Sequence, residues 1–267
     1  MQYLKMFALC LYPRHYDDIK KLNYVPVGLG EKKFSNKWLS DKTGENISQK
    51  NPFYGEYTFH YWLWKNLLDQ IREDWIGFCG YRYFWQKNNN KLISPSKEDI
   101  LVDIPDDWKN YETIIPCEQF TNNIKFSKII KNGGLSFLLN KNTYLKKQQS
   151  IMFHFQVFHG KKDLDDAIDL MDIIDRENFR KYVNQNIAFH KWNMFICKSK
   201  QIIKAYYQAL FPWLSRCEKI FGFNLHGYGK RRIYGFLAER FLSYWFTKNT
   251  NFKSWEVFRY NLDAYRK

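Results

Sequence analysis

Glu239 is one of the residues in this sequence best suited to acid–base chemistry, because it is a carboxylate in an otherwise apolar, helix-like segment. It stands beside Arg240 in YGFLAERF. In that setting the carboxylate is either a general base or one half of an Arg–Glu pair that locks two helices together. The residues alone slightly favour the structural pair, and both interpretations stay open.

Arg82 is the cation best placed to bind an anion. It follows an apolar stretch that we expect to be a buried strand, in the segment GYRYFW (residues 80–85). The guanidinium is a forked donor that matches phosphate or carboxylate oxygens. The competing interpretation is structural, since an arginine among aromatic rings also makes cation–π contacts.

A polar loop followed by an aromatic helix is predicted for residues 40–66, SDKTGENISQKNPFYGEYTFHYWLWKN. The Asp, Asn, Ser and Gly residues of its first half favour turns. From Tyr57 the apolar residues recur at helical spacing. Free amides at a helix start suit a diphosphate, so the segment fits a sugar or nucleotide pocket as well as it fits a surface loop on a buried helix.

The sequence offers no convincing metal site. Asp163 and Asp165 form a literal Asp-x-Asp, but acidic residues are common at helix starts, where they complement the helix dipole. His154 and His159 are too far apart for an i, i+4 pair of ligands, and a buried histidine is the favoured interpretation of each. His154 is also kept as a candidate on the acceptor side.

The composition of the 267 residues predicts a globular protein with an anionic partner. Apolar residues make up 45% of the chain, aromatic residues 19%, and the formal net charge is +15. The positive charge is scattered, with short clusters only at Lys161-Lys162 and Lys230-Arg231-Arg232. Scattered charge fits peripheral contact with an anionic membrane better than nucleic acid, which is not expected as a partner. An RNA-binding module stays as a lesser alternative.

A cytoplasmic location, with contact at the inner face of a membrane, is expected. The five cysteines are odd in number and widely spaced, which suits a reducing compartment. No apolar run approaches the ~20 residues that a spanning helix needs. Phe211-Pro212-Trp213-Leu214 is the candidate for an element that dips into the lipid.

These residues require a framework, and the pattern predicts an α/β fold. Short apolar runs predict strands at Met6–Leu11, Asp74–Phe84, Tyr111–Pro116 and Asn193–Cys197. Helical spacing marks residues 137–159, 164–183, 202–221 and 233–246, and residues 86–105 read as an exposed excursion. Alternation of strands and helices favours a mostly parallel central sheet flanked by helices, with a more helical C-terminal part.

Four blocks in fixed order resemble a bacterial family of capsular and exopolysaccharide glycosyltransferases catalogued as a domain of unknown function. The blocks are TGENISQKNPFYGEYTFHYWLWKN, IGFCGYRYFW, NMFICK and YGFLAERF, and the resemblance spans residues 24–245. It implies a GT-A-like fold and one glycosyltransferase domain over residues 1–267. Residues 1–120 would bind the nucleotide sugar, and residues 121–267 would form a mainly helical acceptor side.

The resemblance also implies substrates. The donor would be a nucleotide sugar linked to UDP, and some members resemble transferases of galactofuranose. The acceptor would be a growing surface glycan or a lipid-linked glycan. A non-catalytic nucleotide- or glycan-binding protein of the same fold is the alternative. Whether Mn²⁺ or Mg²⁺ assists stays open.

The resemblance marks site residues position by position. Donor-side residues would be Tyr24, Gly30, Asp41, Asn46, Ser48, Lys50, Asn51, Lys65, Tyr81 and Arg82. Acceptor-side residues would be Trp62, Trp64, Asn193, Met194 and Arg240. His154, named above, is a further candidate on this side. An inverting transfer needs a carboxylate to take the proton of the acceptor hydroxyl, and Glu56 and Glu239 are the two candidates.

The chain departs from the pattern of the family at several positions. Gly80 replaces a usual His, and Tyr83 replaces an Arg. Leu11-Tyr12 stands where relatives carry His-Lys, and Gly28 replaces a Gln. These departures bear on the identity of the donor and on activity.

Overall fold

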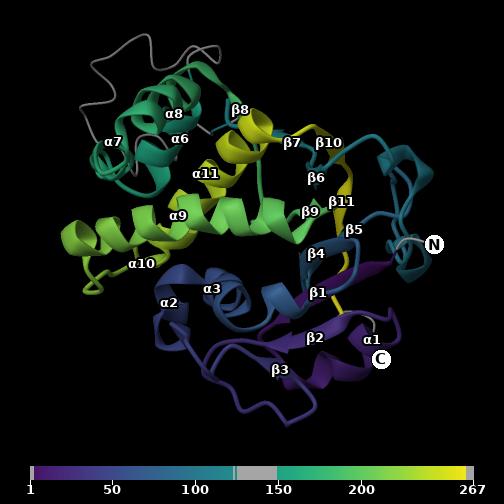
Figure 1. Ribbon diagram of the computed structural model, residues 1–267. Coiled ribbons are helices and arrows are strands. Elements are labelled where there is room, and N and C mark those ends of the chain that lie inside the picture. Colours follow the sequence, from purple (N-terminus) through teal and green to yellow (C-terminus); the bar gives the residue numbers. More distant parts are fainter. Residues whose placement is uncertain (1–2, 123, 125–148, 263–267) are drawn as a thin grey trace. The chain divides into compact units, whose positions relative to one another are not determined.

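The apolar run near the amino terminus forms the central strand β1 (Leu4–Cys10) of a large sheet, as the sequence predicts. Its parallel neighbours are β2 (Val25–Gly28) and β4 (Trp75–Gly80). The short strand β3 (Leu39–Ser40) pairs with β2, also in parallel, so one half of the sheet has the order β3-β2-β1-β4 (Figure 1).

The other half of the sheet is mixed. β9 (Ile196–Cys197) runs antiparallel to both β4 and β6 (Thr113–Pro116), and β10 (Phe252–Trp255) pairs with β6 in parallel. β5 (Tyr83–Trp85) and β11 (Val257–Arg259) form an antiparallel pair beside β4. The predicted α/β class, with a mostly parallel central sheet flanked by helices, is confirmed.

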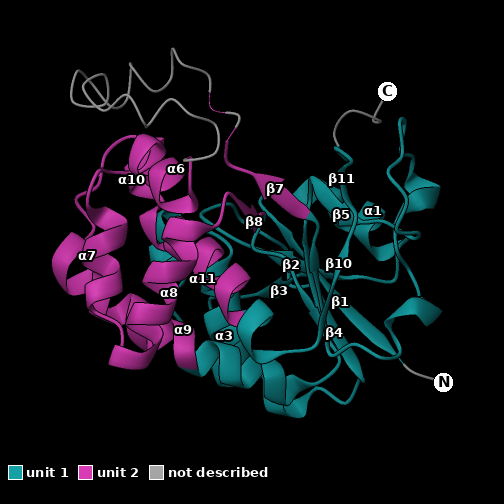
Figure 2. Cartoon of the chain, turned by 90° about the horizontal axis from the view of Figure 1, so that it is seen from above, with its two compact units in different colours: residues 1–117, 192–208, 246–267 teal, residues 118–191, 209–245 magenta. Residues whose placement is uncertain are grey.

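The computed structural model describes residues 3–122, 124 and 149–262, and the chain divides into two compact units. Unit 1 contains residues 1–117, 192–208 and 246–267, whereas unit 2 contains residues 118–191 and 209–245 (Figure 2). The single domain expected from the sequence stays a prediction. The structure adds that residues 192–208 and 246–267 belong to unit 1. The expected division of the chain near residue 120 assigned both segments to the other part.

Side chains alternate between the two faces of a strand, and those of β1 have packing partners on both faces of the sheet in unit 1. Met6, Ala8 and Cys10 share a core with residues of α1 (Tyr16–Lys20). Phe7 faces the opposite way, and its ring lies 5.3 Å from that of Phe59 in α3 (Tyr57–Asn66). The short helix α2 (Asn51–Tyr54) precedes α3.

Unit 2 is mainly helical. It contains a small antiparallel sheet of β7 (Glu118–Phe120) and β8 (Ala188–His190). Among its described residues, the helices that lie wholly in this unit are α6 (Ile151–Phe158), α7 (Asp163–Asp169), α8 (Ile173–Gln185) and α10 (Tyr228–Arg231). α9 (Lys200–Phe221) and α11 (Ile233–Asn249) contribute residues to both units.

Several sequence-based boundaries differ from the structure. The strand predicted for residues 74–84 is a hairpin, because the chain turns at Tyr81 and Arg82 between β4 and β5. The helix predicted for residues 164–183 is two helices, since Asp172 is extended, with φ −64° and ψ 147°. Part of the helix predicted for residues 137–159 lies outside the described residues, and the rest forms α6.

The lipid-dipping element predicted at residues 211–214 is wrong. These residues belong to α9, and Phe211, Trp213 and Leu214 are buried. The Trp213 indole N–H donates to the Ala167 carbonyl at 2.7 Å, so the ring is a core contact of unit 2. Among the described residues, no helix combines the length and the apolar character needed to cross a membrane.

Candidate functional site

The carboxyl ends of three parallel strands meet at one edge of the sheet in unit 1. Cys10 of β1 is in register with Gly28 of β2, and Leu9 is in register with Gly80 of β4. The segments that follow these strands therefore leave from the same edge. Open α/β sheets bind ligands outside the carboxyl ends of their strands.

Two tyrosines and three cations gather at this edge. The Lys32 Nζ atom lies 3.9 Å from the Tyr12 ring centroid, and the Arg14 guanidinium carbon lies 4.8 Å from it. The Tyr81 ring is 5.3 Å from Tyr12, and the Arg82 guanidinium carbon lies 5.0 Å from the Tyr81 ring. We call these five residues the sheet-edge cluster. The three cations are exposed at a place where an anionic ligand is expected.

A buried histidine supports the aromatic part of the sheet-edge cluster. The His15 ring stacks on Tyr81 with centroids 5.6 Å apart, and its Nδ1 atom lies 3.3 Å from the Cys10 Sγ atom. Burial raises the pKa of Tyr81 to about 12, although Arg82 acts in the opposite direction. The Tyr81 hydroxyl therefore keeps its proton at neutral pH.

A candidate base lies in the turn region between α2 and α3. Glu56 directly precedes α3, and the Asn193 side-chain amide donates to its Oε1 atom at 3.1 Å. Because β9 runs antiparallel to β4, the residues before β9 lie at the carboxyl end of β4. Glu56 and Asn193 therefore lie toward the carboxyl ends of the strands, at the same edge of the sheet as the sheet-edge cluster.

The turn that carries Asn193 has an unusual backbone. Trp192 has φ 78° and Asn193 has φ 52°, both in the left-handed region that residues with side chains rarely adopt. Such backbone costs on the order of 1–3 kcal/mol and persists where the surroundings determine it, often at functional sites. Here the Trp192 ring stacks on Tyr83 at 5.3 Å, which holds the turn.

Asp41 is a buried carboxylate at the end of β3. Neither of its oxygens has a hydrogen bond of standard geometry, and burial raises its pKa. The nearby Thr58 hydroxyl and Lys42 act in the opposite direction on that pKa. The Asn51 amide donates to Thr58 Oγ1 at 3.1 Å and to the Gly55 carbonyl at 2.9 Å. Asp41 and Asn51 therefore flank the same hydroxyl.

Two glycines at this edge have different surroundings. A Cβ atom on Gly28 would lie 2.5 Å from the ring of Phe34, so the glycine makes room for that side chain. The Gln that the resemblance leads us to expect at this position would require Phe34 to move. A Cβ atom on Gly80 would meet no atom within 4 Å, so the space for a side chain is present there.

Other residues that the sequence marks serve the loop after β3. The Asn46 Oδ1 atom accepts from the Ser48 amide at 3.2 Å and the Ser48 hydroxyl at 2.8 Å. The Trp62 indole N–H donates to the Thr43 carbonyl at 2.7 Å, and Lys65 lies 3.4 Å from Glu45. These side chains hold the loop onto α3.

The remaining marked residues of unit 1 have varied surroundings. Tyr24 is buried at the amino end of β2, and its hydroxyl donates to the Leu101 carbonyl. Met194 is also in the core, whereas Gly30 lies beside Asn51. Trp64 is half-buried under the Lys65 ammonium, at 4.3 Å, and Lys50 is half-buried at the start of α2.

The marked residues of unit 2 form a buried network around Arg240. The Arg240 guanidinium donates to Glu239 Oε2 at 2.7 Å, and its Nη2 atom lies 3.2 Å from His154 Nδ1. It also lies 4.5 Å from the Phe189 ring centroid. Burial, and then Arg240 itself, lower the pKa of His154 to about 2, so this histidine is neutral. Lys191 lies in the same network, and burial lowers its pKa.

No group of three or more His, Cys, Asp or Glu residues that could hold a metal ion occurs among the described residues. The acidic cluster at α7 has basic partners. Asp163 lies 3.8 Å from Lys230, and Arg180 contacts Asp165 at 2.5 Å and Asp169 at 2.6 Å.

Sequence reasoning did not select several members of this site. Tyr12 entered only as a departure from the family pattern, and Arg14 was not among the candidates. No sequence pattern marked Lys32 or Trp192, because their contacts join segments that are adjacent in the fold but distant in the sequence.

Comparisons with known proteins place the chain in a family and match its fold. Residues 9–250 match the family described as Domain of unknown function (DUF4422). Among solved structures, the chain resembles the apo structure of WbbM, a bifunctional glycosyltransferase, with a TM-score of 0.64 and 20% sequence identity. The match covers 96% of this chain and 45% of that one, so the chain spans less than half of the protein it resembles. No curated protein matches the chain in sequence.

Proposed function

The chain belongs to the family described as Domain of unknown function (DUF4422), and we propose that it is a glycosyltransferase with a nucleotide-sugar donor. The fold likeness to a protein titled a bifunctional glycosyltransferase supports this proposal. The observation that carries it is the sheet-edge cluster. It offers Arg14, Lys32 and Arg82 at the carboxyl ends of parallel strands, where a nucleotide diphosphate would bind.

In the proposed reaction, the acceptor hydroxyl oxygen forms a bond to the anomeric carbon of the sugar while the bond between the sugar and the diphosphate breaks. Negative charge then grows on the leaving diphosphate oxygen. Cations fixed beside the leaving oxygen of the diphosphate stabilise this charge as it develops. The forked guanidinium groups of Arg14 and Arg82 suit a pair of phosphate oxygens, and Lys32 supplies a point charge. The Tyr81 hydroxyl, which keeps its proton at neutral pH, adds a neutral donor.

We propose Glu56 as the base that takes the proton of the acceptor hydroxyl. Its Oε1 atom accepts a hydrogen bond from the Asn193 side-chain amide, which orients the carboxylate. Glu239 is the second candidate. Its contact with the buried Arg240 guanidinium at 2.7 Å favours a structural ion pair.

Replacing each carboxylate separates the two candidates. We expect Glu56→Gln to lower the turnover of the donor by about 10²- to 10⁴-fold, with donor binding retained. The measurement is UDP release with a panel of UDP-sugars and a glycan acceptor. Asn193→Ala is the matched positioning variant, and it should lower turnover less than Glu56→Gln does. If Glu56→Gln and Glu239→Gln both retain wild-type turnover, neither residue is the base.

The donor and acceptor follow from the family resemblance. We propose a UDP-linked hexose, with UDP-galactofuranose as one member of the panel, and a surface polysaccharide or a lipid-linked glycan as acceptor. Work on such an acceptor would place the protein in the cytoplasm at the inner face of the membrane. The formal net charge of +15 supports attraction to an anionic surface there.

A non-catalytic nucleotide-binding protein is the second candidate, and the open space at Gly80 favours it. Where relatives carry a histidine, this chain has room but no side chain. In this alternative UDP binds the wild-type protein while no UDP-sugar of the panel is turned over. Gly80→His should then add turnover. Turnover of any UDP-sugar of the panel by the wild-type protein would remove the alternative.

A further inference from the structure

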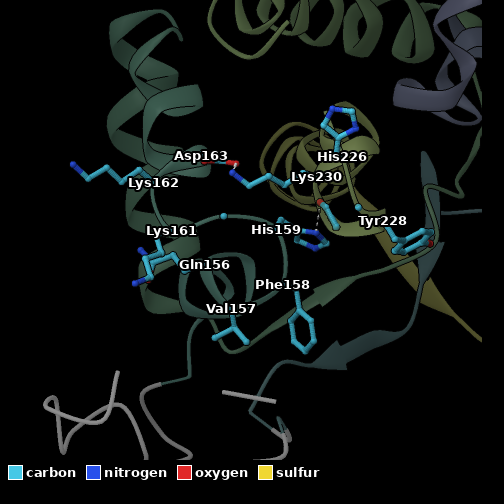
Figure 3. Close-up of a pocket in the computed structure, with 13 residues that line it drawn as sticks. Gln156, Val157, Phe158, His159, Lys161, Lys162, Asp163, His226, Tyr228 and Lys230 are labelled. Carbon is cyan, nitrogen blue, oxygen red and sulfur yellow. Dashed lines mark hydrogen bonds and ion pairs between the residues drawn. The ribbon is translucent and has the colours of Figure 1, made fainter. Parts of the chain in front are cut away.

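A cavity in unit 2 joins the two basic clusters of the sequence. It has a volume of about 760 Å³ and lies between the segment that follows α6 and the segment that contains α10. Lys161, Lys162 and Lys230 all line it, although Lys162 and Lys230 are 68 positions apart. Figure 3 shows Lys161 and Lys162 on the side of the view opposite Tyr228, with Lys230 directed at Asp163.

The two segments are fastened together by contacts that require glycine. The His159 Nδ1 atom lies 3.0 Å from the Gly229 carbonyl oxygen. A Cβ atom on Gly229 would lie 2.2 Å from the Phe158 carbonyl oxygen, so a side chain at this position would push the segments apart. His159 also stacks on Phe236 with centroids 3.9 Å apart. The wall of the cavity is therefore a built feature of the fold.

The charge of the cavity is positive. Three lysines line it, against one carboxylate, Asp163. Lys230 lies 3.8 Å from that carboxylate. Lys161 and Lys162 are exposed on the other side. A lining with this excess of lysines attracts ligands that carry more than one negative charge.

The aromatic residue at the opposite side makes the cavity suited to a ligand larger than a free phosphate. Tyr228 is 73% exposed, and its ring packs edge-on against Phe236 at 5.8 Å. The volume falls in the range of small-molecule sites, roughly 300–1,000 Å³. The exposed ring offers a flat face for the organic part of a phosphate ester.

We infer that this cavity binds the diphosphate group of an organic diphosphate ester, with Lys161, Lys162 and Lys230 as its cationic contacts. The ester is either a lipid-linked diphosphate or a nucleoside diphosphate. Binding of the diphosphate group does not require turnover. Only the assignment of the ester to a substrate rests on the proposed function.

Titration calorimetry with inorganic pyrophosphate tests the inference on the full chain. The sheet-edge cluster also attracts diphosphate, so the titrations are made in an Arg14→Ala/Arg82→Ala background. We expect Lys161→Ala/Lys162→Ala to weaken pyrophosphate binding at least about tenfold, since each variant residue removes a charge-assisted contact. The matched control is Lys181→Ala/Lys219→Ala, which removes two other exposed lysines of unit 2 and should leave the affinity unchanged.

Geranyl diphosphate and UDP then distinguish the two sources in the same background. Selective loss of geranyl diphosphate binding in Lys161→Ala/Lys162→Ala assigns the cavity to a lipid-linked diphosphate. Selective loss of UDP binding assigns it to a nucleotide. Pyrophosphate affinity that is equal in this variant and its control, or no binding in the background protein, overturns the inference. Failure of the glycosyltransferase proposal would instead show as absent turnover, with pyrophosphate binding intact.

Discussion

The two units hold their arginines in different surroundings. In unit 1, Arg82 is exposed at the sheet edge and lies over one face of Tyr81. In unit 2, Arg240 is only 1% exposed and contacts Glu239, His154 and the ring of Phe189. A buried guanidinium must be satisfied inside the protein, whereas an exposed one keeps its donors for a ligand. The resemblance marks both arginines, and the structure shows that their surroundings differ.

Removing the buried arginine should have the largest effect on stability. Arg240→Ala leaves the Glu239 carboxylate partly buried without its cation, and we expect a loss of about 3–5 kcal/mol in the free energy of unfolding. Arg82→Ala should change it by less than about 0.5 kcal/mol, because that side chain is at the surface. Urea unfolding of the two variants measures the difference. Equal losses would remove the distinction between the two arginines.

Acidification should destabilise the network around Arg240. The pKa of His154 is about 2 in the folded protein, below its usual value of 6.5, because burial disfavours the charged form. The unfolded chain therefore binds more protons than the folded chain between these values. Stability is fully present above pH 6.5 and falls as the pH falls toward the folded pKa.

The size of this pH effect follows from linkage. One such histidine costs at most about 1.4 kcal/mol per pH unit, which gives about 2 kcal/mol between pH 6.5 and 5. His60 of unit 1 has a pKa of about 3 and contributes in the same direction. We expect His154→Gln to reduce the loss of unfolding free energy between pH 7 and 5, and His60→Gln to do so independently. An unchanged pH dependence in both variants would contradict the buried neutral state of these rings.

The exposed arginine, Arg82, should contribute to the affinity for the donor nucleotide. We expect Arg82→Ala to weaken UDP binding by about tenfold, since one charge-assisted contact to phosphate is lost. Arg82→Lys should recover part of the affinity, because the charge returns without the forked geometry. Calorimetric titration with UDP checks both variants. An Arg82→Ala protein that binds UDP as the wild type does would remove Arg82 from the donor site.

The smallest effect is expected at Lys65, which the resemblance also marks as a donor residue. In the structure this ammonium group lies 3.4 Å from Glu45 and 4.3 Å from the Trp64 ring centroid. Lys65→Ala should therefore change UDP affinity by less than about twofold, because an exposed pair of this kind contributes little. A tenfold loss would instead return Lys65 to the donor site.

The sequence predicted the framework of unit 1 better than its site. The strand at residues 6–11 was readable because a short, buried, parallel strand is continuously apolar. The hairpin at Tyr81 and Arg82 could not be predicted, since both of its strands contain aromatic residues and no typical turn residue separates them. The C-terminal strands β10 and β11 were also missed. They pair with β6 and β5, more than a hundred positions earlier, and no local pattern records such a pairing.

The site itself depends on contacts between distant segments. Tyr12 and Lys32 become neighbours only because β1 and β2 are paired in parallel. Glu56 meets Asn193 across more than a hundred positions. The family resemblance marked Glu56, Asn193, Tyr81 and Arg82, but it carried no geometry. The structure adds that Glu56, Asn193, Tyr81 and Arg82 share an edge of the sheet in unit 1, and this supports the proposal of Glu56 as the base.

A crystal structure with bound UDP tests the central proposal most directly. The account predicts that the diphosphate lies at the carboxyl ends of β1, β2 and β4, with its oxygens within hydrogen-bonding distance of Arg14, Lys32 or Arg82. A diphosphate held only by residues of unit 2, such as Lys161 and Lys162, would contradict the assignment of the donor to the sheet edge.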